Sequence, residues 1–228
     1  IAIGDAEVIG QVRPLRQPPT VVVDNDPSKT AEGLVVWNWL YDVHIEETYI
    51  NSKGERETRR YWREIDSESG DESFITHDGT GGMVVEPESF SRKELGQPII
   101  TWSCSHASYR QLREINLWKA VRTYGSGRVL EHRWRLWGLS VGDPCMVHGS
   151  ATTLTEKAAK NYGVSKKDPP NSRMALLGTD SEAMKTKIWR GSELTNVALA
   201  ESAFETTVIP VIMMLFATTA SIICYLAL

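Results

Sequence analysis

The stretch ESFITHDGTGGMVVEP, residues 72–87, contains two short apolar runs on either side of a tight turn. Asp78-Gly79 lies in this turn, and Asp-Gly pairs are typical of hairpin connections because glycine readily accepts positive φ values. Val, Ile, Phe and Thr in the flanking runs favour extended backbone. We therefore predict two short strands joined by a turn from His77 to Gly82.

Three runs upstream of this hairpin also predict strands. GDAEVIGQVRP (4–14) alternates apolar and polar residues, and LVVWNWLYDVHIEETYI (34–50) begins with an apolar stretch typical of burial on both faces. NSKGE (51–55) predicts a turn, after which ETRRYWREID (57–66) returns as a strand. The Pro- and Asp-rich residues 17–33 predict a loop.

The pattern changes downstream of the hairpin. Apolar residues near helical spacing predict a helix from Ala107 to Tyr124, ended by Gly125. RVLEHRWRLWGL (128–139) and PCMVHGSATT (144–153) predict two more strands joined by a turn at residues 140–143. Residues 156–170 are Lys-rich and predict a surface linker, and residues 180–204 predict an amphipathic helix.

The C-terminal stretch TTVIPVIMMLFATTASIICYLAL (206–228) contains no charged residue. At about 1.5 Å per residue, a helix of this length reaches roughly 34 Å, enough for a hydrocarbon core of about 30 Å. We therefore predict a single-pass membrane protein with a large extramembrane domain. The predicted parts are a β-barrel (1–155), a linker with a juxtamembrane helix (156–205) and a transmembrane helix (206–228).

The orientation in the membrane is left open, because few basic residues lie near the predicted span. A signal or a membrane helix ahead of Ile1 would change the topology. Within the span, small residues recur four positions apart, a spacing that favours close packing against another helix. These residues are Ala217, Ala220, Ser221 and Cys224.

Composition narrows the function classes. The net charge of −4 provides no general attraction to nucleic acid or to anionic lipid. Cys104, Cys145 and Cys224 are too few for a disulfide framework or a four-thiolate zinc site.

Several short motifs recur in an order that resembles one known family. These are Glu7-Val8-Ile9-Gly10-Gln11-Val12-Arg13-Pro14, Trp62, Phe74, Asp78-Gly79-Thr80-Gly81, Val85, Pro87, Gly142-Asp143, Val147 and Gly149. In these motifs and in the predicted membrane span that follows them, the chain resembles the GIDE domain family. This domain occurs in prokaryotic membrane proteins and in the mitochondrial membrane E3 ubiquitin ligase. The resemblance implies a domain beside the bilayer, with a short strand and a Ser/Glu-led helix over residues 176–183.

Two departures from the family limit what the resemblance implies. Gly33-Leu34-Val35-Val36-Trp37 stands where the family usually has a Cys, and the ligase's zinc-binding RING domain has no counterpart in this sequence. Ubiquitin transfer is therefore not implied.

The same pattern can be interpreted physically. Glycines at strand bends, two Asp/Gly turns and one helix between the third and fourth strands are typical of OB-like barrels, in which the helix plugs one end. We predict a mainly β fold: a small OB-like β-barrel with one inserted helix, plus the C-terminal transmembrane helix. Its structural turns are expected at Asp78, Gly79, Thr80, Gly81, Gly142 and Asp143.

The residues that could carry chemistry do not form a recognisable catalytic or metal motif. Cys104-Ser105-His106 has the character of half a metal site, and Asp78 beside His77 could form an acid/base pair, but Asp in such turns more often accepts backbone N–H bonds. Residues 24–35 alternate oxygen ligands, with Lys29 where a calcium loop requires glycine. The histidines are scattered: His44, His77, His106, His132 and His148. We expect no catalytic residue, metal or cofactor.

Two runs interleave cations with aromatic residues, as single-strand nucleic-acid binders do. They are Arg59-Arg60-Tyr61-Trp62-Arg63 and Arg133-Trp134-Arg135 with Trp137. Strand alternation would place Trp62 on the face opposite to Arg59, Tyr61 and Arg63, and neighbouring acidic residues weaken any phosphate field. We therefore expect no nucleic-acid partner.

These observations favour a non-enzymatic, membrane-anchored β-barrel that acts as a protein-interaction, accessory or scaffolding subunit of a multi-subunit membrane complex, for example a respiratory or photosynthetic assembly. Its expected partners are other integral membrane subunits and the lipid bilayer, and we do not expect a small-molecule ligand. Two alternatives stay open: a regulatory membrane protein related to the ligase but lacking its RING, and an OB-type binder of oligonucleotides or glycans.

Overall fold

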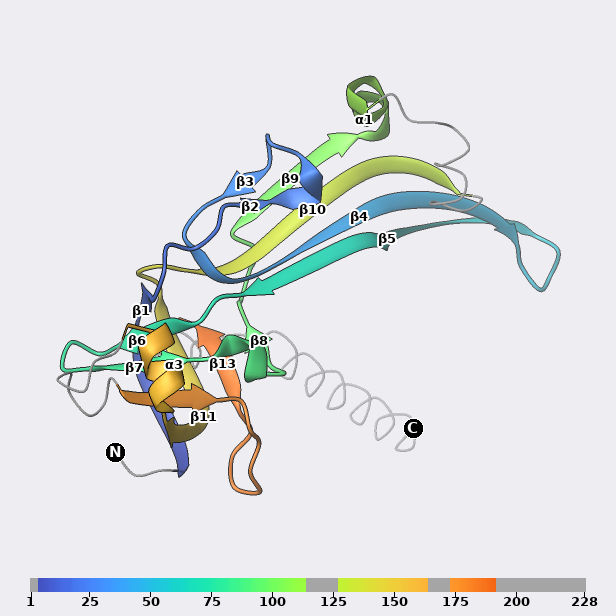
Figure 1. Cartoon of the computed structure of the whole chain (residues 1–228). Helices are drawn as coiled ribbons and strands as arrows, with labels where there is room; N and C mark the ends of the chain where they lie inside the picture. The colour runs from blue at the N-terminus through green and yellow to red at the C-terminus, as the bar shows by residue number, and fades with distance from the viewer. Residues whose placement is uncertain (1–3, 114–126, 164–172, 192–228) are drawn as a thin grey trace, which may run out of the picture. The chain divides into compact units, whose positions relative to one another are not determined.

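The computed structural model describes residues 4–113, 127–163 and 173–191. Contacts divide the chain into one compact unit from Ile1 to Arg190 and a second from Gly191 to Leu228, and the described residues belong almost entirely to the first (Figure 1). Within the described ranges, no helix has the length and apolar character that crossing a membrane requires. The predicted span, with Ala217, Ala220, Ser221 and Cys224, lies outside the described residues.

Five strands close into a mixed β-barrel. In pairing order they are β1 (Gly4–Pro14), β6 (Phe74–His77), β7 (Gly82–Val85), β12 (Met174–Leu177) and β11 (Pro144–Thr153), which pairs again with β1. β7 and β12 run parallel, and the other neighbours run antiparallel. Side chains from all five strands meet in one core, where Val12, Phe74, Val85, Val147 and Leu176 are almost completely buried.

Short elements extend and cover this barrel. β13 (Lys187–Arg190) pairs with β11 and with β8 (Lys93–Glu94), and a 3-10 turn, η2 (Pro87–Ser89), follows β7. α3 (Glu156–Asn161) begins where the Thr155 hydroxyl accepts the Ala158 N–H at 3.2 Å. Ala158 and Tyr162 then pack on Val84 and Ala175, so the helix covers part of the barrel.

A second sheet of four antiparallel strands carries the longest elements. Its order is β5 (Arg56–Asp71), β4 (Leu34–Ile50), β10 (Arg128–Ser140) and β9 (Ile100–Ser105), and Figure 1 shows the long strands running side by side. β10 pairs with β4 no further than Glu46 among the described residues, so β4 and β5 continue together to the turn at residues 51–55.

One face of this sheet is a second hydrophobic core. Val43, Ile45, Trp134 and Leu136 are almost completely buried there. They are covered by β2 (Val21–Val22), η1 (Val23–Asn25), β3 (Thr30–Ala31) and α1 (His106–Arg113), which contributes Tyr109.

The mainly β class, the closed barrel and the hairpin around residues 77–82 are confirmed. The helix predicted from Ala107 to Tyr124 is confirmed as far as Arg113, and residues 114–124 lie outside the described residues. Its expected packing is wrong, because α1 follows β9 and packs on the four-stranded sheet instead of plugging the barrel. The long strands from residues 34–66 likewise form this separate sheet, in which β4 pairs with β5 on one side and with β10 on the other, and their apolar face is covered by β2, η1, β3 and α1.

The predicted barrel boundary at residue 155 is too early. β12, which closes the barrel between β7 and β11, lies in the segment expected to be linker and helix. The prediction of a helix from residue 180 is wrong over its described part, because Lys187–Arg190 pairs as β13 with two strands that are distant in sequence.

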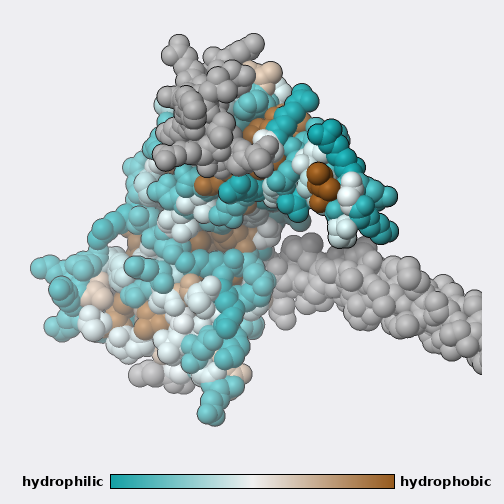
Figure 2. All heavy atoms as spheres, turned by 90° about the vertical axis from the view of Figure 1, so that its right-hand side faces the viewer, coloured by the Kyte–Doolittle hydropathy of each residue, from teal (hydrophilic) through white to brown (hydrophobic). Residues whose placement is uncertain are grey.

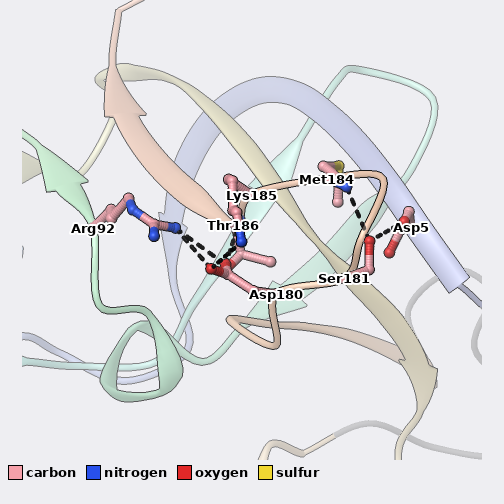
Figure 3. Close-up of polar contacts among 7 residues, drawn as sticks. All are labelled: Asp5, Arg92, Asp180, Ser181, Met184, Lys185 and Thr186. Atoms are coloured by element: carbon pink, nitrogen blue, oxygen red, sulfur yellow. Dashed lines mark hydrogen bonds and ion pairs between the residues drawn. The ribbon is translucent and has the colours of Figure 1, made fainter.

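The loop between β12 and β13 is held by side chains rather than by a helix (Figure 3). Asp180 accepts hydrogen bonds from the Thr186 N–H at 2.8 Å and from the Thr186 hydroxyl at 2.7 Å, and it pairs with Arg92 at 3.0 Å. These bonds, those from Thr186 first, lower the pKa of Asp180. Ser181 donates to Asp5 of β1 at 2.6 Å, so the loop is fastened to the barrel.

Candidate functional site

The face of the four-stranded sheet opposite its core carries an alternating row of aromatic and charged side chains. In the register, His44 of β4 lies opposite Trp62 of β5, and Asp42 lies opposite Arg133 of β10. Because side chains alternate between faces along a strand, these residues lie on one face. Arg135 and Trp137 lie on the same face, because they follow Arg133 at every second position of β10. We call five residues of this face the Trp–Arg ladder: Trp62, Arg133, Asp42, Arg135 and Trp137.

Asp42 organises the centre of the Trp–Arg ladder. Its carboxylate accepts hydrogen bonds from Arg133 Nε at 3.0 Å, Arg133 Nη2 at 2.7 Å and Arg135 Nη2 at 2.7 Å. The hydrogen bond to Asp42 raises the pKa of Arg133 above its usual value. The Asp42 side chain is 3 % exposed, whereas the two arginine side chains are 25 % and 28 % exposed. The side chains of Arg133 and Arg135 are therefore partly exposed, whereas the carboxylate that they bind is buried.

Each guanidinium group also lies over an indole ring. Arg133 Cζ is 3.6 Å from the ring centroid of Trp62, and Arg135 Cζ is 5.0 Å from that of Trp137, both within cation–π range. His44 stacks on Trp62 with ring centroids 4.9 Å apart. Together these contacts hold the Trp–Arg ladder in one arrangement.

The sequence-predicted aromatic and cationic residues fall into three groups. The predicted separation of Trp62 from Tyr61 is confirmed, because Tyr61 packs on the sheet core. Arg59 and Arg60, by contrast, pair across the hairpin with Glu47 at 2.8 Å and Glu46 at 2.7 Å. Trp134 lies in the core, 1 % exposed. Sequence reasoning missed Asp42, since nothing in a single strand's sequence shows which cations the neighbouring strand places beside it.

The predicted turn at Asp78–Gly81 is held by hydrogen bonds to its own side chains. Asp78 Oδ1 accepts the N–H groups of Thr80 at 2.8 Å and Gly81 at 2.9 Å, and these bonds, that from Gly81 first, lower the pKa of Asp78 to about 2. His77 Nδ1 accepts the Gly79 N–H at 3.0 Å. Both side chains of the suggested acid/base pair are thus engaged in the shape of the loop.

The turn at Gly142-Asp143 is fastened to β1. The Gly142 N–H donates to the Val12 carbonyl at 2.8 Å, and the Val12 N–H donates to the Asp143 carbonyl at 2.9 Å. Since Gln11 pairs with His77 on the next strand, three segments of the sequence motif meet at one end of the barrel.

A buried chain of hydrogen bonds joins Tyr41, His132 and His106 beneath α1. Tyr41 Oη lies 2.7 Å from His132 Nδ1, and His132 Nε2 lies 2.9 Å from His106 Nδ1. Burial, together with the nearby His106, lowers the pKa of His132 to about 4, so this side chain is neutral at pH 7. The sequence could not pair these histidines, because they meet through the register of β9 and β10.

The suggested metal ligands do not come together. Within the ranges that the structure describes, no three His, Cys, Asp or Glu side chains are placed to hold a metal. In the loop that resembled a calcium site, Asp24 accepts the indole N–H of Trp134 at 3.1 Å, and Asp26 pairs with Lys29. Within this loop, Lys29 therefore provides the counter-charge of Asp26.

The two described cysteines are poor nucleophiles. Burial raises the pKa of Cys145 to about 11, and burial also raises the pKa of Cys104. Both thiols stay protonated at neutral pH, and a protonated thiol is a weak nucleophile and metal ligand. Cys145 instead contacts the Thr76 hydroxyl at 3.4 Å inside the barrel.

Comparison of the chain with known protein families, with curated proteins and with solved structures finds no match.

Proposed function

We propose that this protein is a non-enzymatic, membrane-anchored interaction subunit that binds another protein through the Trp–Arg ladder. The observation that carries the proposal is the ladder itself: two indoles and two arginines set around one buried carboxylate. Trp and Arg are the residue types most enriched at binding hot spots, and a prearranged set loses less entropy on binding.

The surface of the molecule is compatible with recognition at such discrete points. Figure 2 shows one face that is largely hydrophilic, with hydrophobic atoms in small separate patches. A broad apolar surface is typical of an obligate oligomer core, whereas separate aromatic and charged anchors with a polar rim are typical of a specific docking interface.

The membrane anchor and the family relationship are parts of this proposal. The apolar residues 206–228 would hold the domain at the bilayer. The relationship to the GIDE domain is supported by the meeting of its motif segments at Val12, His77 and Gly142. An OB-like assignment is supported by the strand order, in which the fifth barrel strand, β12, lies between the third and the fourth.

Purification of the full chain from membranes in a mild detergent tests the function. We expect a second protein to co-purify in a fixed ratio, and the double variant Trp62→Ala/Trp137→Ala to lose it while still unfolding cooperatively, at a lower midpoint because Trp137 also packs on the barrel core. Ile50→Ala, at the far end of the same sheet and 74 % exposed, serves as the matched control. Recovery of the native chain only as a free monomer would contradict the proposal.

A second candidate is an OB-type oligonucleotide binder, which the alternation of cations and aromatics in the ladder favours. The short strands β6 and β7 that would form the usual binding face bury Phe74, Thr76, Met83, Val84 and Val85. Asp42 also neutralises part of the ladder's charge. Tight, salt-sensitive retention of single-stranded DNA, lost in Trp137→Ala, would favour this candidate over protein binding.

A further inference from the structure

Strand β5 forms one edge of the four-stranded sheet, and within the ranges that the structure describes no strand pairs with its outer side (Figure 1). It is sixteen residues long, about 50 Å, and its residues are exposed except at Tyr61, Ile65, Gly70 and Asp71. An open edge carries a row of unpaired N–H and C=O groups, to which a further strand can add. The described residues therefore leave the outer side of β5 open to another strand.

The charges of β5 are separated along its length. Residues 56–63 contain four arginines and one glutamate, whereas residues 64–71 contain four acidic residues and no basic one. Parallel pairing with a second copy of β5 would set like charges against each other, but antiparallel pairing sets the basic half of each copy against the acidic half of the other. Charged edges usually prevent pairing, but this order of charges favours a second β5 over other strands.

A bulge in β5 restricts the register of such a pair. Tyr41 pairs with Asp66 and Asp42 with Glu64, so Ile65 is an extra residue on β5. Even-numbered residues before the bulge and odd-numbered residues after it therefore lie on the face of the Trp–Arg ladder. Directly opposite residues of an antiparallel pair must share a face, and this condition allows only some positions of the two-fold axis.

Among these positions, an axis at Arg63 gives the best match of charge. It places Arg56 opposite Asp71 and Arg59 opposite Glu68 of the second copy, and it uses the whole length of the strand. An axis at Trp62 would place Glu57 opposite Glu68. An axis at Glu64 would bring the two Glu64 side chains together.

We propose that this protein forms a two-fold symmetric homodimer in which two β5 strands pair antiparallel about an axis at Arg63. The two four-stranded sheets then become one sheet of eight strands. Arg59 keeps its bond to Glu47 of β4 and gains Glu68 of the second copy. At the axis itself the two Arg63 side chains meet, which is the one unfavourable charge pair of this register.

The dimer has a consequence for the Trp–Arg ladder. A two-fold axis perpendicular to a sheet keeps each face on its own side, so the ladders of the two copies lie on the same face. A partner with two matching sites would then bind more tightly than to a single copy. The homodimer itself does not depend on the interaction function proposed above.

Cysteine cross-linking of the full chain in mild detergent locates the contact. Opposite residues of antiparallel strands have Cα atoms about 4.5 to 5.5 Å apart, within the range of a disulfide. We therefore expect Arg63→Cys to form a covalent dimer under mild oxidation. Thr48→Cys, exposed on the neighbouring strand β4, is the matched control and should not do so. The native chain, with its own three cysteines, gives the background.

Charge reversal tests the register. Glu68→Arg should weaken the dimer at least about tenfold, measured by analytical ultracentrifugation, because it sets Arg59 against a like charge twice per dimer. Arg59→Glu/Glu68→Arg restores the opposite charges and should return the dissociation constant to within about threefold of the native value. Glu88→Arg changes the net charge equally at an exposed position outside β5 and should have no effect.

The axis makes a prediction of its own. Arg63→Gln removes the like-charge pair and should tighten the dimer several-fold. A native chain that stays monomeric up to about 100 µM would overturn the inference. So would a covalent dimer of Thr48→Cys as abundant as that of Arg63→Cys, equal weakening by Glu68→Arg and Glu88→Arg, or a double reversal that stays as weak as the single one.

The homodimer and the proposed function fail in different ways. If the β5 contact forms as expected and no second protein co-purifies, the homodimer stands and the interaction function fails. If a second protein co-purifies with a chain whose β5 strands do not cross-link, the interaction function stands and the homodimer fails.

Discussion

Asp42 accepts three hydrogen bonds from two guanidinium groups while it is almost completely buried. Asp42→Asn would leave both arginines without their counter-charge next to the core, and removal of one member of a buried ionic set is strongly destabilising. We expect a loss of about 2 to 4 kcal/mol in the free energy of unfolding, at the lower end because the arginines can reach water. Urea unfolding measures it.

Glu46→Gln is the appropriate control for this substitution. Glu46 pairs with Arg60, whose side chain is 63 % exposed, and exposed ion pairs contribute less than about 1 kcal/mol. Similar losses in the two variants would mean that burial does not determine the role of Asp42.

His132 predicts a specific dependence of stability on pH. Its pKa is about 4 in the folded protein, against an ordinary histidine value of 6.5, so the unfolded chain takes up the proton first as the pH falls. The stability linked to this group is complete above about pH 6.5 and is lost between pH 6.5 and 4, by at most about 3 kcal/mol. Unfolding free energies measured across this window test the prediction.

The variant His132→Gln isolates the effect. Asp26 and Asp78 also have lowered pKa values, but their contributions are lost only below the ordinary carboxyl value of 3.8. We therefore expect the variant to be less stable at pH 7 and flatter between pH 6.5 and 4. A slope identical to that of the native chain would assign the pH dependence to other groups.

A strand or turn can be predicted from the sequence when the residues that determine its conformation lie within the element itself. The strand Leu34–Ile50 and the turn after it have the bounds that the sequence predicts, because a long apolar β-branched run and an Asn/Gly turn carry their own signals. β12 and β13 have four residues each, too few for a periodic pattern. Their conformation follows from pairing with strands far away in sequence, as for Met174 with Thr153.

The same limit applies to the candidate site. The cations and aromatics of the Trp–Arg ladder are recognisable from sequence, but their arrangement depends on the register of three strands. A shift of one residue in β10 would send Arg133 into the core and Trp134 to the surface.

The close approach of β1 and β6 at Gly10 allows a test of the packing between barrel strands. A Cβ at Gly10 would lie 2.7 Å from the carbonyl carbon of His77, and neither backbone can move without breaking the pairing of Gln11 with His77. We expect Gly10→Ala to cost about 1 to 3 kcal/mol in the free energy of unfolding. Ile9→Ala, next to it on β1 and 38 % exposed, should cost less than about 1 kcal/mol and controls for the loss of strand propensity.

At the scale of the whole molecule, the barrel is closed by residues far from its other strands in sequence. Leu176 of β12 and Ile188 of β13 are completely buried in the core that also contains Phe74, Val85 and Val147. A chain cut after Thr155 would lose both strands, leaving β7 and one side of β11 unpaired and the core open to water. Unpaired edges of this kind promote aggregation.

We therefore expect residues 1–190 to unfold cooperatively and residues 1–155 not to do so. The first compact unit ends at Arg190 and contains its own core. Removal of residues 191–228 alone should therefore leave the unfolding midpoint of the barrel unchanged. Near-ultraviolet circular dichroism reports on the buried tryptophans, and binding of a hydrophobic dye reports on an exposed core. A cooperative transition of residues 1–155 at the midpoint of residues 1–190 would mean that β12 and β13 cover the barrel without closing it.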